Sequence, residues 1–334
     1  MLHQFEKSKS ALGEEAELGL KFYFLNAQGE VIHEDAYCSQ KMLPMASTKK
    51  IAIALFVLFK VYKENNLELD QRVDIENHDF SPGRPTNTLD RFFFIPWITT
   101  EKRTIRELLT YMLTESDNTS TDVLLNLVGG TKKINAFINH LDLNGFNLSY
   151  SSKELLSEYF SLSQSKSISN IFKTIYEFIW GYSFRITENS MVQSETDSCT
   201  PEMMANLLKL LIEKQEVEWI SQAKEFIFST MNRCLTGDRV IKAGASILAP
   251  HTFGSKQGAI GGIRNDTAYI EFDDQNKAII SIHTCKSKEP LRRRDEVIAS
   301  LAAKILEEYC GPYLKNKYNL ENKSYADSKY VFRH

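Results

Sequence analysis

Metal-binding and disulfide-forming residues are sparse in this sequence. The five cysteines among 334 residues are scattered and odd in number, and none has the paired spacing of a zinc site. The seven histidines include no His-x-x-x-His pair. We therefore expect no metal and no cofactor. Unpaired thiols of this kind are typical of a reducing compartment.

Long apolar runs and a charge excess of one sign are also missing. No stretch is long enough to cross a bilayer, and the first residues lack the apolar core of a secretory signal. We expect a cytoplasmic protein without membrane association; the alternative is a periplasmic or secreted protein whose signal has been removed. With 40 basic and 43 acidic residues the net charge is −3, so no nucleic-acid partner is expected.

The sequence does contain enough apolar residues, 43%, to form a large core. Strand patterns lie near the N-terminus at 18–25 and 31–33 and again in the last third, and helical patterns lie between them. This order predicts an α+β fold in which an antiparallel sheet from both chain ends is flanked by helices. The predicted sheet domain comprises 17–65 plus 245–312, the inserted all-helical domain 66–244, a helical insertion 155–195, and a polar tail 313–334.

The central stretch is an apolar helix that begins with a serine and a lysine. Pro44 ends the preceding segment, and the Ser-x-x-Lys spacing puts Ser47 and Lys50 on one face of the helix. A neutral amine can take the proton of a neighbouring hydroxyl, and the N–H groups of a helix N-terminus can stabilise an oxyanion. The pattern indicates a serine hydrolase or acyl-transferase. Alone, it is more typical of a helix with an N-cap serine.

Two further polar groups follow in the chain. Ser116-Asp117-Asn118 lies between two helical patterns, where a hydroxyl can relay a proton and an amide can hold a carbonyl. Lys256-Gln257-Gly258 lies on a predicted strand, where the lysine can bind a carboxylate. Taken singly, the first group also fits a turn that ends a helix, and the second an ordinary exposed lysine.

Together and in this order, the three groups resemble the motif set of class A β-lactamases and penicillin-binding proteins. The likeness extends to the entrance of the serine helix at 44–48, the helix at 115–125, Gly129-Gly130, and Thr200-Pro201, which follows an Ω-loop in that family. It spans roughly residues 18–310. The resemblance implies a β-lactamase/transpeptidase-like fold and a small-molecule substrate, and we expect a monomer.

The resemblance also implies roles for matching residues. Ser47 would attack a lactam or amide carbonyl and form an acyl-enzyme, and Lys50 would help to deprotonate it. Ser116 would pass a proton to the leaving nitrogen. Asn118 would hold the substrate amide and orient Lys50, while Lys256 would support Ser116 and bind the substrate carboxylate.

The substrate-binding edge departs from the family pattern. Gln257 stands where a hydroxyl residue is usual, and Arg264 could supply the missing contact with a carboxylate. Gly258 and Ala259 would line the substrate, with the backbone N–H groups of Ser47 and Ala259 as the oxyanion hole. Phe80 lies where the family has an aromatic loop at the mouth of the cleft.

The glutamate that would activate the deacylating water has three candidates. Glu154 fits the count from Gly129-Gly130, whereas Glu188 and Glu195 fit the count back from Thr200-Pro201. We take Glu154 as the expected base. Without such a base, the acyl-enzyme would form and stall, as in penicillin-binding proteins.

These features predict a serine hydrolase that opens a β-lactam or related amide through an acyl-enzyme. The alternatives are an esterase or D,D-peptidase-like enzyme of the same fold, a slowly turning-over penicillin-binding protein with a non-antibiotic substrate, and an inactive binder that uses the same pocket.

Overall fold

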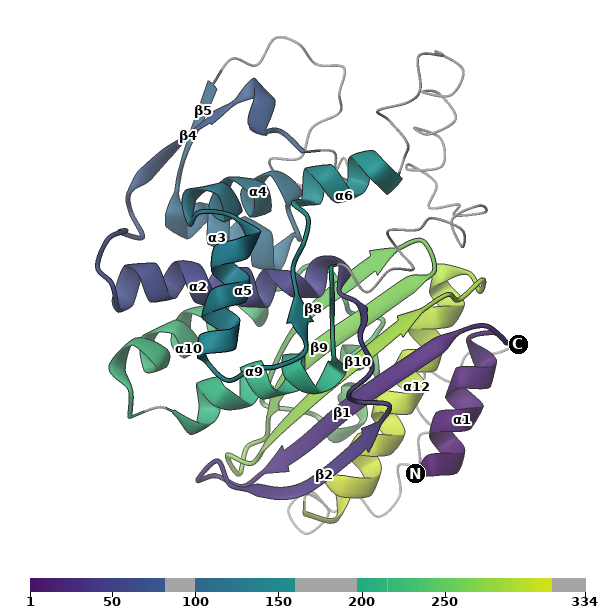
Figure 1. Cartoon of the computed structure of the whole chain (residues 1–334). Coiled ribbons are helices and arrows are strands. Elements are labelled where there is room, and N and C mark those ends of the chain that lie inside the picture. Colours follow the sequence, from purple (N-terminus) through teal and green to yellow (C-terminus); the bar gives the residue numbers. More distant parts are fainter. Residues whose placement is uncertain (82–99, 160–196, 215, 314–334) are drawn as a thin grey trace, which may run out of the picture.

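The structure is a computed structural model that describes residues 1–81, 100–159, 197–214 and 216–313 (Figure 1). An antiparallel five-stranded sheet has the order β2-β1-β10-β9-β8. The first two of its strands in sequence come from the N-terminal part and the others from the C-terminal part, as predicted. The bounds are β1 Glu17–Leu25, β2 Val31–Tyr37, β8 Thr252–Ile260, β9 Ile263–Glu271 and β10 Lys277–Cys285.

The pairing of β1 with β10 joins the two chain ends at the centre of the sheet. Because side chains alternate along a strand, Phe22 and Phe24 of β1 face one core, whereas Tyr23 and Leu25 face another. Helices α1 (Leu2–Ala11) and α12 (Leu291–Tyr309) cover the first face, and α9 (Pro201–Glu213) and α10 (Glu218–Met231) pack on the second (Figure 1). The sheet therefore has a helical layer on each side.

The helix α2 (Lys50–Tyr62) lies at the centre of the second core, and every residue from Lys50 to Leu58 is buried. It contacts α10 and the helices of the middle third of the chain, as expected for a helix that is apolar on nearly all sides. These helices are α3 Ile105–Thr114, α4 Asn118–Leu127 and α5 Thr131–His140, with α6 Ser152–Tyr159 packed on α4.

Two helix starts have the caps that their own residues favour. Thr104 accepts a hydrogen bond from the Glu107 N–H, and the Glu107 carboxylate accepts one from the Thr104 N–H, which is the reciprocal capping box. Thr200 caps α9, with Pro201 as the first helical residue. Local sequence thus fixes the ends of helices that carry or support the polar loops.

Several segments differ from the predictions or were not predicted. The loop-rich stretch 66–103 contains a paired strand at each end, β4 (Arg72–Glu76) and β5 (Thr100–Thr104). Near the N-terminus, residues 2–11 form the helix α1. Short strands β3 (Leu43–Pro44), β6 (Phe146–Asn147) and β7 (Ser198–Cys199) form a further small sheet. The predicted insertion from 160 onward and the tail from 314 onward lie outside the described residues, and the domain boundaries stay a prediction.

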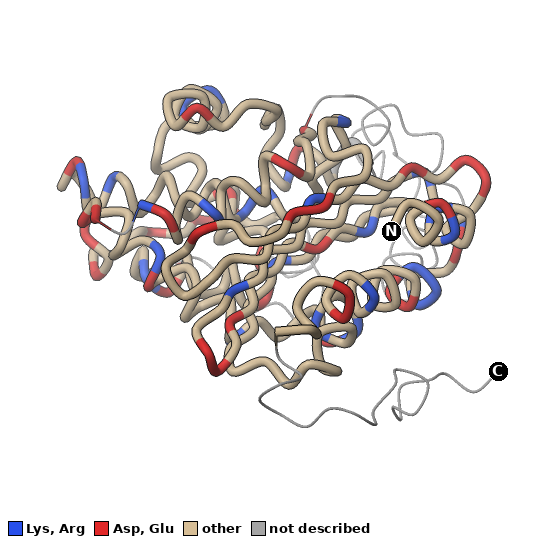
Figure 2. The backbone as a smooth tube through the Cα atoms, turned by 90° about the horizontal axis from the view of Figure 1, so that it is seen from below, with Lys and Arg blue, Asp and Glu red and all other residues tan. Residues whose placement is uncertain are grey.

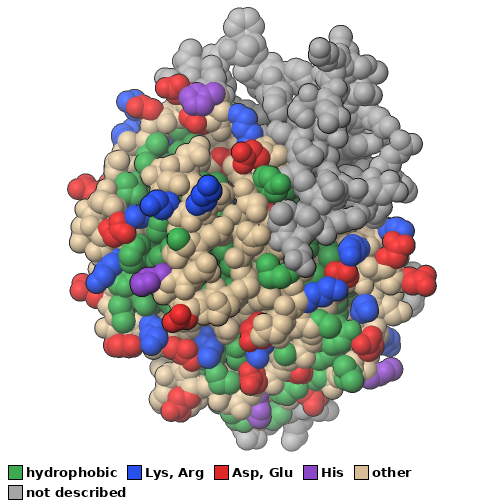
Figure 3. All heavy atoms as spheres, in the orientation of Figure 1, with side chains coloured by type: hydrophobic (Ala, Val, Ile, Leu, Met, Phe, Trp, Pro, Cys, Tyr) green, Lys and Arg blue, Asp and Glu red, His purple; other side chains and the backbone are tan. Residues whose placement is uncertain are grey.

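Charges of both signs are spread over the described chain. Figure 2 shows acidic and basic positions interspersed along the backbone, and the face in Figure 3 shows the same mixture on the surface. Within the described residues no helix is long and apolar enough to cross a membrane.

We expect Phe5→Ala to lower the free energy of unfolding by about 3 kcal/mol, because it leaves a cavity between α1 and the sheet. Phe5 is 2% exposed, and its ring lies 5.3 Å from that of Tyr37. The matched control is Leu2→Ala on the same helix, since Leu2 is 67% exposed. Chemical denaturation measures both variants. Equal stability of the two variants would show that α1 is not docked as described.

Candidate active site

Ser47 lies in a tight turn before α2. This turn, η1 (Ala46–Lys49), is a 3-10 helix, so the α-helix begins at Lys50 rather than at the serine. The Met45 carbonyl accepts hydrogen bonds from the N–H and the hydroxyl of Thr48, which tighten the turn. Ser47 is half-buried, so its hydroxyl lies at the edge of the core.

The buried amine of Lys50 is bound by the loop between α3 and α4. Its Nζ donates to the backbone oxygen of Ser116, to Asn118 Oδ1 at 2.8 Å and to Ser116 Oγ at 3.2 Å. Lys50 is 0% exposed, whereas Ser116 and Asn118 are half-buried. The structure therefore brings together Lys50, Ser116 and Asn118 directly after the turn that carries Ser47.

The loop itself needs an uncommon backbone. Ser116 has φ +62°, a left-handed conformation that costs free energy for a residue with a side chain. Asp117 is buried and caps α4 by accepting from the Ser120 N–H at 2.7 Å. The turn that the sequence suggested as the structural alternative is thus present in the same three residues: Asp117 caps the helix, and its two neighbours face Lys50.

The strand β8 passes directly against the serine turn. A Cβ atom added to Gly258 would lie 2.8 Å from the backbone nitrogen of Ser47, so only glycine fits there without a shift. Lys256 shares this face by strand alternation and is fully buried; its Nζ donates to the Gln257 carbonyl at 3.0 Å. Ala259 follows Gly258 on the strand, which brings its backbone near the same turn.

Asn265 on β9 fastens the serine turn to the sheet. Its Nδ2 donates to the carbonyls of Pro44, at 2.6 Å, and Met45, at 3.1 Å, and its Oδ1 accepts from the Thr284 N–H. Sequence reasoning missed this residue. The one feature of the sequence that could have indicated Asn265 is its position shortly after Lys256-Gln257-Gly258.

Arg264 lies on the other face of the sheet. It is 5% exposed, and its Nε donates to the carboxylate of Asp295 on α12. Because its neighbour Asn265 faces the serine turn, alternation turns Arg264 toward α12. This ion pair replaces the predicted contact of Arg264 with a substrate carboxylate. By strand alternation, Gln257 lies on the same face of the sheet as Arg264. It is half-buried and belongs to the edge strand β8.

Glu154 has a structural contact at the start of α6. Its Oε2 accepts from the Ser151 N–H at 2.9 Å, while Ser151 Oγ accepts from the Glu154 N–H. This is a capping box, and the Glu154 side chain is exposed. Its role as a base stays a prediction, and Glu188 and Glu195 lie outside the described residues.

Two buried aspartates that were not predicted as site residues bind the backbone near the start of α6. Asp122 on α4 accepts from the N–H groups of Ser152 and Lys153 and from the Ser81 hydroxyl. Phe80, next to Ser81, packs partly buried against the core near α4. The predicted contact of Phe80 with a substrate stays a prediction.

The second aspartate, Asp197, joins the serine turn to two distant segments. Its carboxylate pairs with Lys49 Nζ at 3.0 Å and accepts from the N–H groups of Ser149 and Tyr150. Both members of the ion pair are buried. Its carbonyl also accepts from the Met45 N–H. Lys49 of this buried ion pair is the neighbour of Lys50 and lies two residues after Ser47. The pair therefore restrains the positions of Lys50 and Ser47.

No histidine near this site serves as an acid or base among the described residues. Burial lowers the pKa of His283 to about 3, so its ring on β10 stays neutral beside the Cys199 thiol. The described chain also contains no cluster of three or more metal-ligating side chains.

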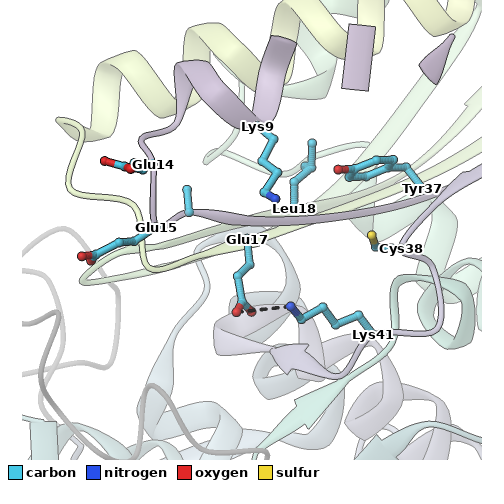
Figure 4. A pocket seen from close by; sticks show the side chains of 9 residues that line it. Lys9, Glu14, Glu15, Glu17, Leu18, Tyr37, Cys38 and Lys41 are labelled. Carbon is cyan, nitrogen blue, oxygen red and sulfur yellow. Dashed lines mark ion pairs between the residues drawn. The ribbon is translucent and has the colours of Figure 1, made fainter. Parts of the chain in front are cut away.

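A separate cavity of about 210 Å³ lies beside α1 and the start of β1. Figure 4 shows Lys9, Tyr37 and Cys38 around it, and an ion pair between Glu17 and Lys41 at 3.2 Å. Glu17 also pairs with Lys286, and none of the predicted catalytic residues lines this cavity.

The chain resembles known β-lactamases along most of its length. The sequence pattern of the β-lactamase enzyme family matches residues 10–309. A β-lactamase of Bacteroides uniformis is 26% identical over 273 residues, which cover 79% of this chain and 78% of that protein. The β-lactamase VEB-1 of Pseudomonas aeruginosa is 24% identical over 263 residues, 78% of this chain and 75% of that protein.

Solved structures show the same fold. An ancestral class A β-lactamase superposes with a TM-score of 0.69 at 21% identity, covering 92% of this chain and 99% of that one. A variant of that ancestor, with the same TM-score and coverage and also 21% identical, is bound to 5(6)-nitrobenzotriazole, described as a transition-state analogue.

We expect Gly258→Ala to lower the acylation rate of Ser47 by a β-lactam about 100-fold, because the added methyl displaces the strand from the Ser47 backbone nitrogen and one oxyanion donor is lost. Stopped-flow acylation measures this rate. Gly311→Ala is the control, since its Cβ would meet nothing within 4 Å. An unchanged rate in Gly258→Ala would mean that this close approach does not shape the oxyanion site.

Proposed function

The chain belongs to the β-lactamase enzyme family, and from this premise we propose that Ser47 opens the amide bond of a β-lactam and carries the acyl group until water releases it. The protein is a serine hydrolase that acts on C–N bonds of a small molecule. The observation that supports the assignment of residues is the buried Lys50, whose amine is held by Ser116 and Asn118 immediately after the Ser47 turn.

In the acylation step, Ser47 Oγ attacks the lactam carbonyl carbon and its proton passes to the Lys50–Ser116 pair. Ser116 Oγ, 3.2 Å from Lys50 Nζ, then gives a proton to the lactam nitrogen as the C–N bond breaks. Asn118 holds Lys50 through its Oδ1, which leaves its Nδ2 as a donor for the substrate's side-chain carbonyl.

The developing oxyanion would be bound by the backbone N–H groups of Ser47 and Ala259. The close approach of Gly258 to the Ser47 nitrogen supports this placement, because it brings the strand backbone to the edge of the serine turn. Backbone donors fixed by a sheet and a tight turn need no reorganisation during the reaction, and each is worth about 2.7–4 kcal/mol.

Deacylation requires a base that activates water, and Glu154 is our candidate. The capping contact fixes its carboxylate at the start of α6, while Asp122 and the Lys49–Asp197 pair hold the adjoining backbone. A glutamate in a capping box keeps a free oxygen for a further hydrogen bond, since the cap uses one of its two oxygens.

The remaining assignments are proposals of the same kind. We infer that the protein has no nucleic-acid or membrane partner, because charges of both signs are mixed along the described backbone and on the face in Figure 3; the monomer stays a prediction. A cytoplasmic location stays a prediction from the sequence. An esterase or D,D-peptidase-like activity is the second candidate function, favoured by Gln257, since this departure alters the edge that binds a substrate carboxylate.

The first test is intact-protein mass spectrometry after mixing with a penicillin and with a cephalosporin, while free product is measured in parallel. Wild type should form a transient adduct and release product. Ser47→Ala should form none and lose at least about 1,000-fold in kcat. A stable adduct without product would favour the penicillin-binding alternative, and an adduct on Ser47→Ala would exclude this nucleophile.

The second test assigns the base. Glu154→Gln should accumulate acyl-enzyme and lower kcat about 100-fold or more, because an amide cannot accept the proton of water. Glutamine also fits a capping box, so α6 keeps its cap and the loss is not structural. Glu154→Ala, which removes both functions, is the comparison for stability. Turnover at the wild-type rate in Glu154→Gln would place the base elsewhere.

A further inference from the structure

Two buried acceptor oxygens belong to residues that are paired across β8 and β9, at the edge of the sheet. Gln257 on β8 and Asp266 on β9 are directly opposite in the antiparallel register and lie on the same face of the sheet. Gln257 Oε1 and Asp266 Oδ1 are both buried, and neither has a hydrogen-bond donor. Buried polar atoms are rarely left in this condition, because each costs the free energy of its lost hydration.

The Asp266 carboxylate has two other hydrogen-bond donors. Its Oδ2 accepts from the Ile241 N–H of α11 (Ile241–Ala245) at 3.2 Å, and the Ser255 hydroxyl of β8 also donates to the carboxylate. Gly237 lies against Ser255 and Gln257 and closes the cluster from the side. No other donor is present for the two orphan oxygens among the described residues.

The charged groups around Asp266 partly offset one another. Lys256 on β8 and Arg264 on its own strand favour the ionised carboxylate, but Arg264 is already paired with Asp295 of α12. On α11, Lys242 pairs with the exposed Asp238. Burial is the larger effect and raises the pKa of Asp266 to about 6.

A single proton would satisfy both orphan oxygens. We propose that Asp266 is a positioning residue which, when protonated, donates a hydrogen bond from Oδ1 to Gln257 Oε1 and fixes the carboxamide with Nε2 turned outward. The amide is planar, so holding its oxygen inward points its N–H donors toward the open edge of β8. There they can bind the carboxylate of a substrate.

This proposal rests on the proposed function, since it concerns how a β-lactam carboxylate is recognised. It gives Gln257 a defined task at a position where the family usually has a hydroxyl. Ionisation of Asp266 would remove the shared proton, place a negative charge behind the edge and release the carboxamide. Recognition of a carboxylate should therefore weaken as Asp266 ionises.

The kinetic test compares a cephalosporin that has a free carboxylate with its methyl ester. In wild type, the ratio of the two kcat/KM values should fall about tenfold as the pH rises from about 5 to about 7.5. Catalytic groups that titrate affect both substrates, so their effects cancel in the ratio. In Asp266→Asn, whose amide donates at every pH, the ratio should stay at the acid value of wild type. The same pH dependence in both proteins would overturn the proposal.

A stability measurement separates this proposal from the proposed function. The folded protein holds the Asp266 proton more tightly than the unfolded chain, whose carboxyl has a pKa of about 3.9. Wild type should therefore lose stability relative to Asp266→Asn as the pH rises from about 4 to about 6, with a constant difference above. This holds whether or not any β-lactam is hydrolysed.

Gln257→Leu is the matched variant and keeps the test usable if Asp266→Asn does not fold. It removes the acceptor for the acid proton and also the oxygen that repels the carboxylate. Both changes lower the pKa of Asp266, so the stability loss should end at a lower pH than in wild type. An identical pH window in Gln257→Leu and wild type would show that the two side chains are not coupled.

Discussion

The buried amine of Lys50 is the constraint to which the rest of the site conforms. It is carried by α2, in which every residue from Lys50 to Leu58 is buried. Burying an amine without hydrogen-bond partners costs free energy, so the amine needs acceptor oxygens. The loop between α3 and α4 supplies them, and Ser116 accepts a left-handed backbone to do so. The amine thus holds the loop in place, and the loop brings a hydroxyl and an amide next to the amine.

A second requirement is contact between the serine turn and the sheet, and two residues provide it. Asn265 uses its amide to bind the carbonyls before the turn, and Gly258 removes the side chain that would keep the strand away. Because both lie within ten residues of Lys256 in the chain, one hairpin supplies the lysine, the close approach and the anchor. The three motifs lie far apart in sequence and become one site only through α2 and this hairpin.

The sequence allowed prediction where the relevant information is local. The cap of Thr104 and the start at Thr200-Pro201 depend on neighbours within one turn of helix, and the structure has both. The predicted helix start at Ser47 is wrong, since Ser47 lies in a 3-10 turn and the α-helix begins at Lys50. The face to which Arg264 points depends on the register between β8 and β9, and its partner Asp295 is 31 residues away. The 3-10 turn at Ser47 depends on how the sheet meets α2. Asp197 and Lys49 show no pattern at all, because a buried ion pair between distant residues leaves no periodic signal.

That ion pair also bears on the second half of the reaction. The three candidate glutamates lie between Tyr150 and Asp197 in the chain, and both of these residues are held by Lys49: it donates to the Tyr150 carbonyl and pairs with the Asp197 carboxylate. Lys49 is itself two residues after Ser47. Tyr150 and Asp197, which flank all three glutamates in the chain, are therefore both bound to the turn that carries Ser47. Removing one partner would leave the other charge buried and unpaired, which costs about 3–5 kcal/mol. The geometry of deacylation is in this way bound to the element that performs acylation.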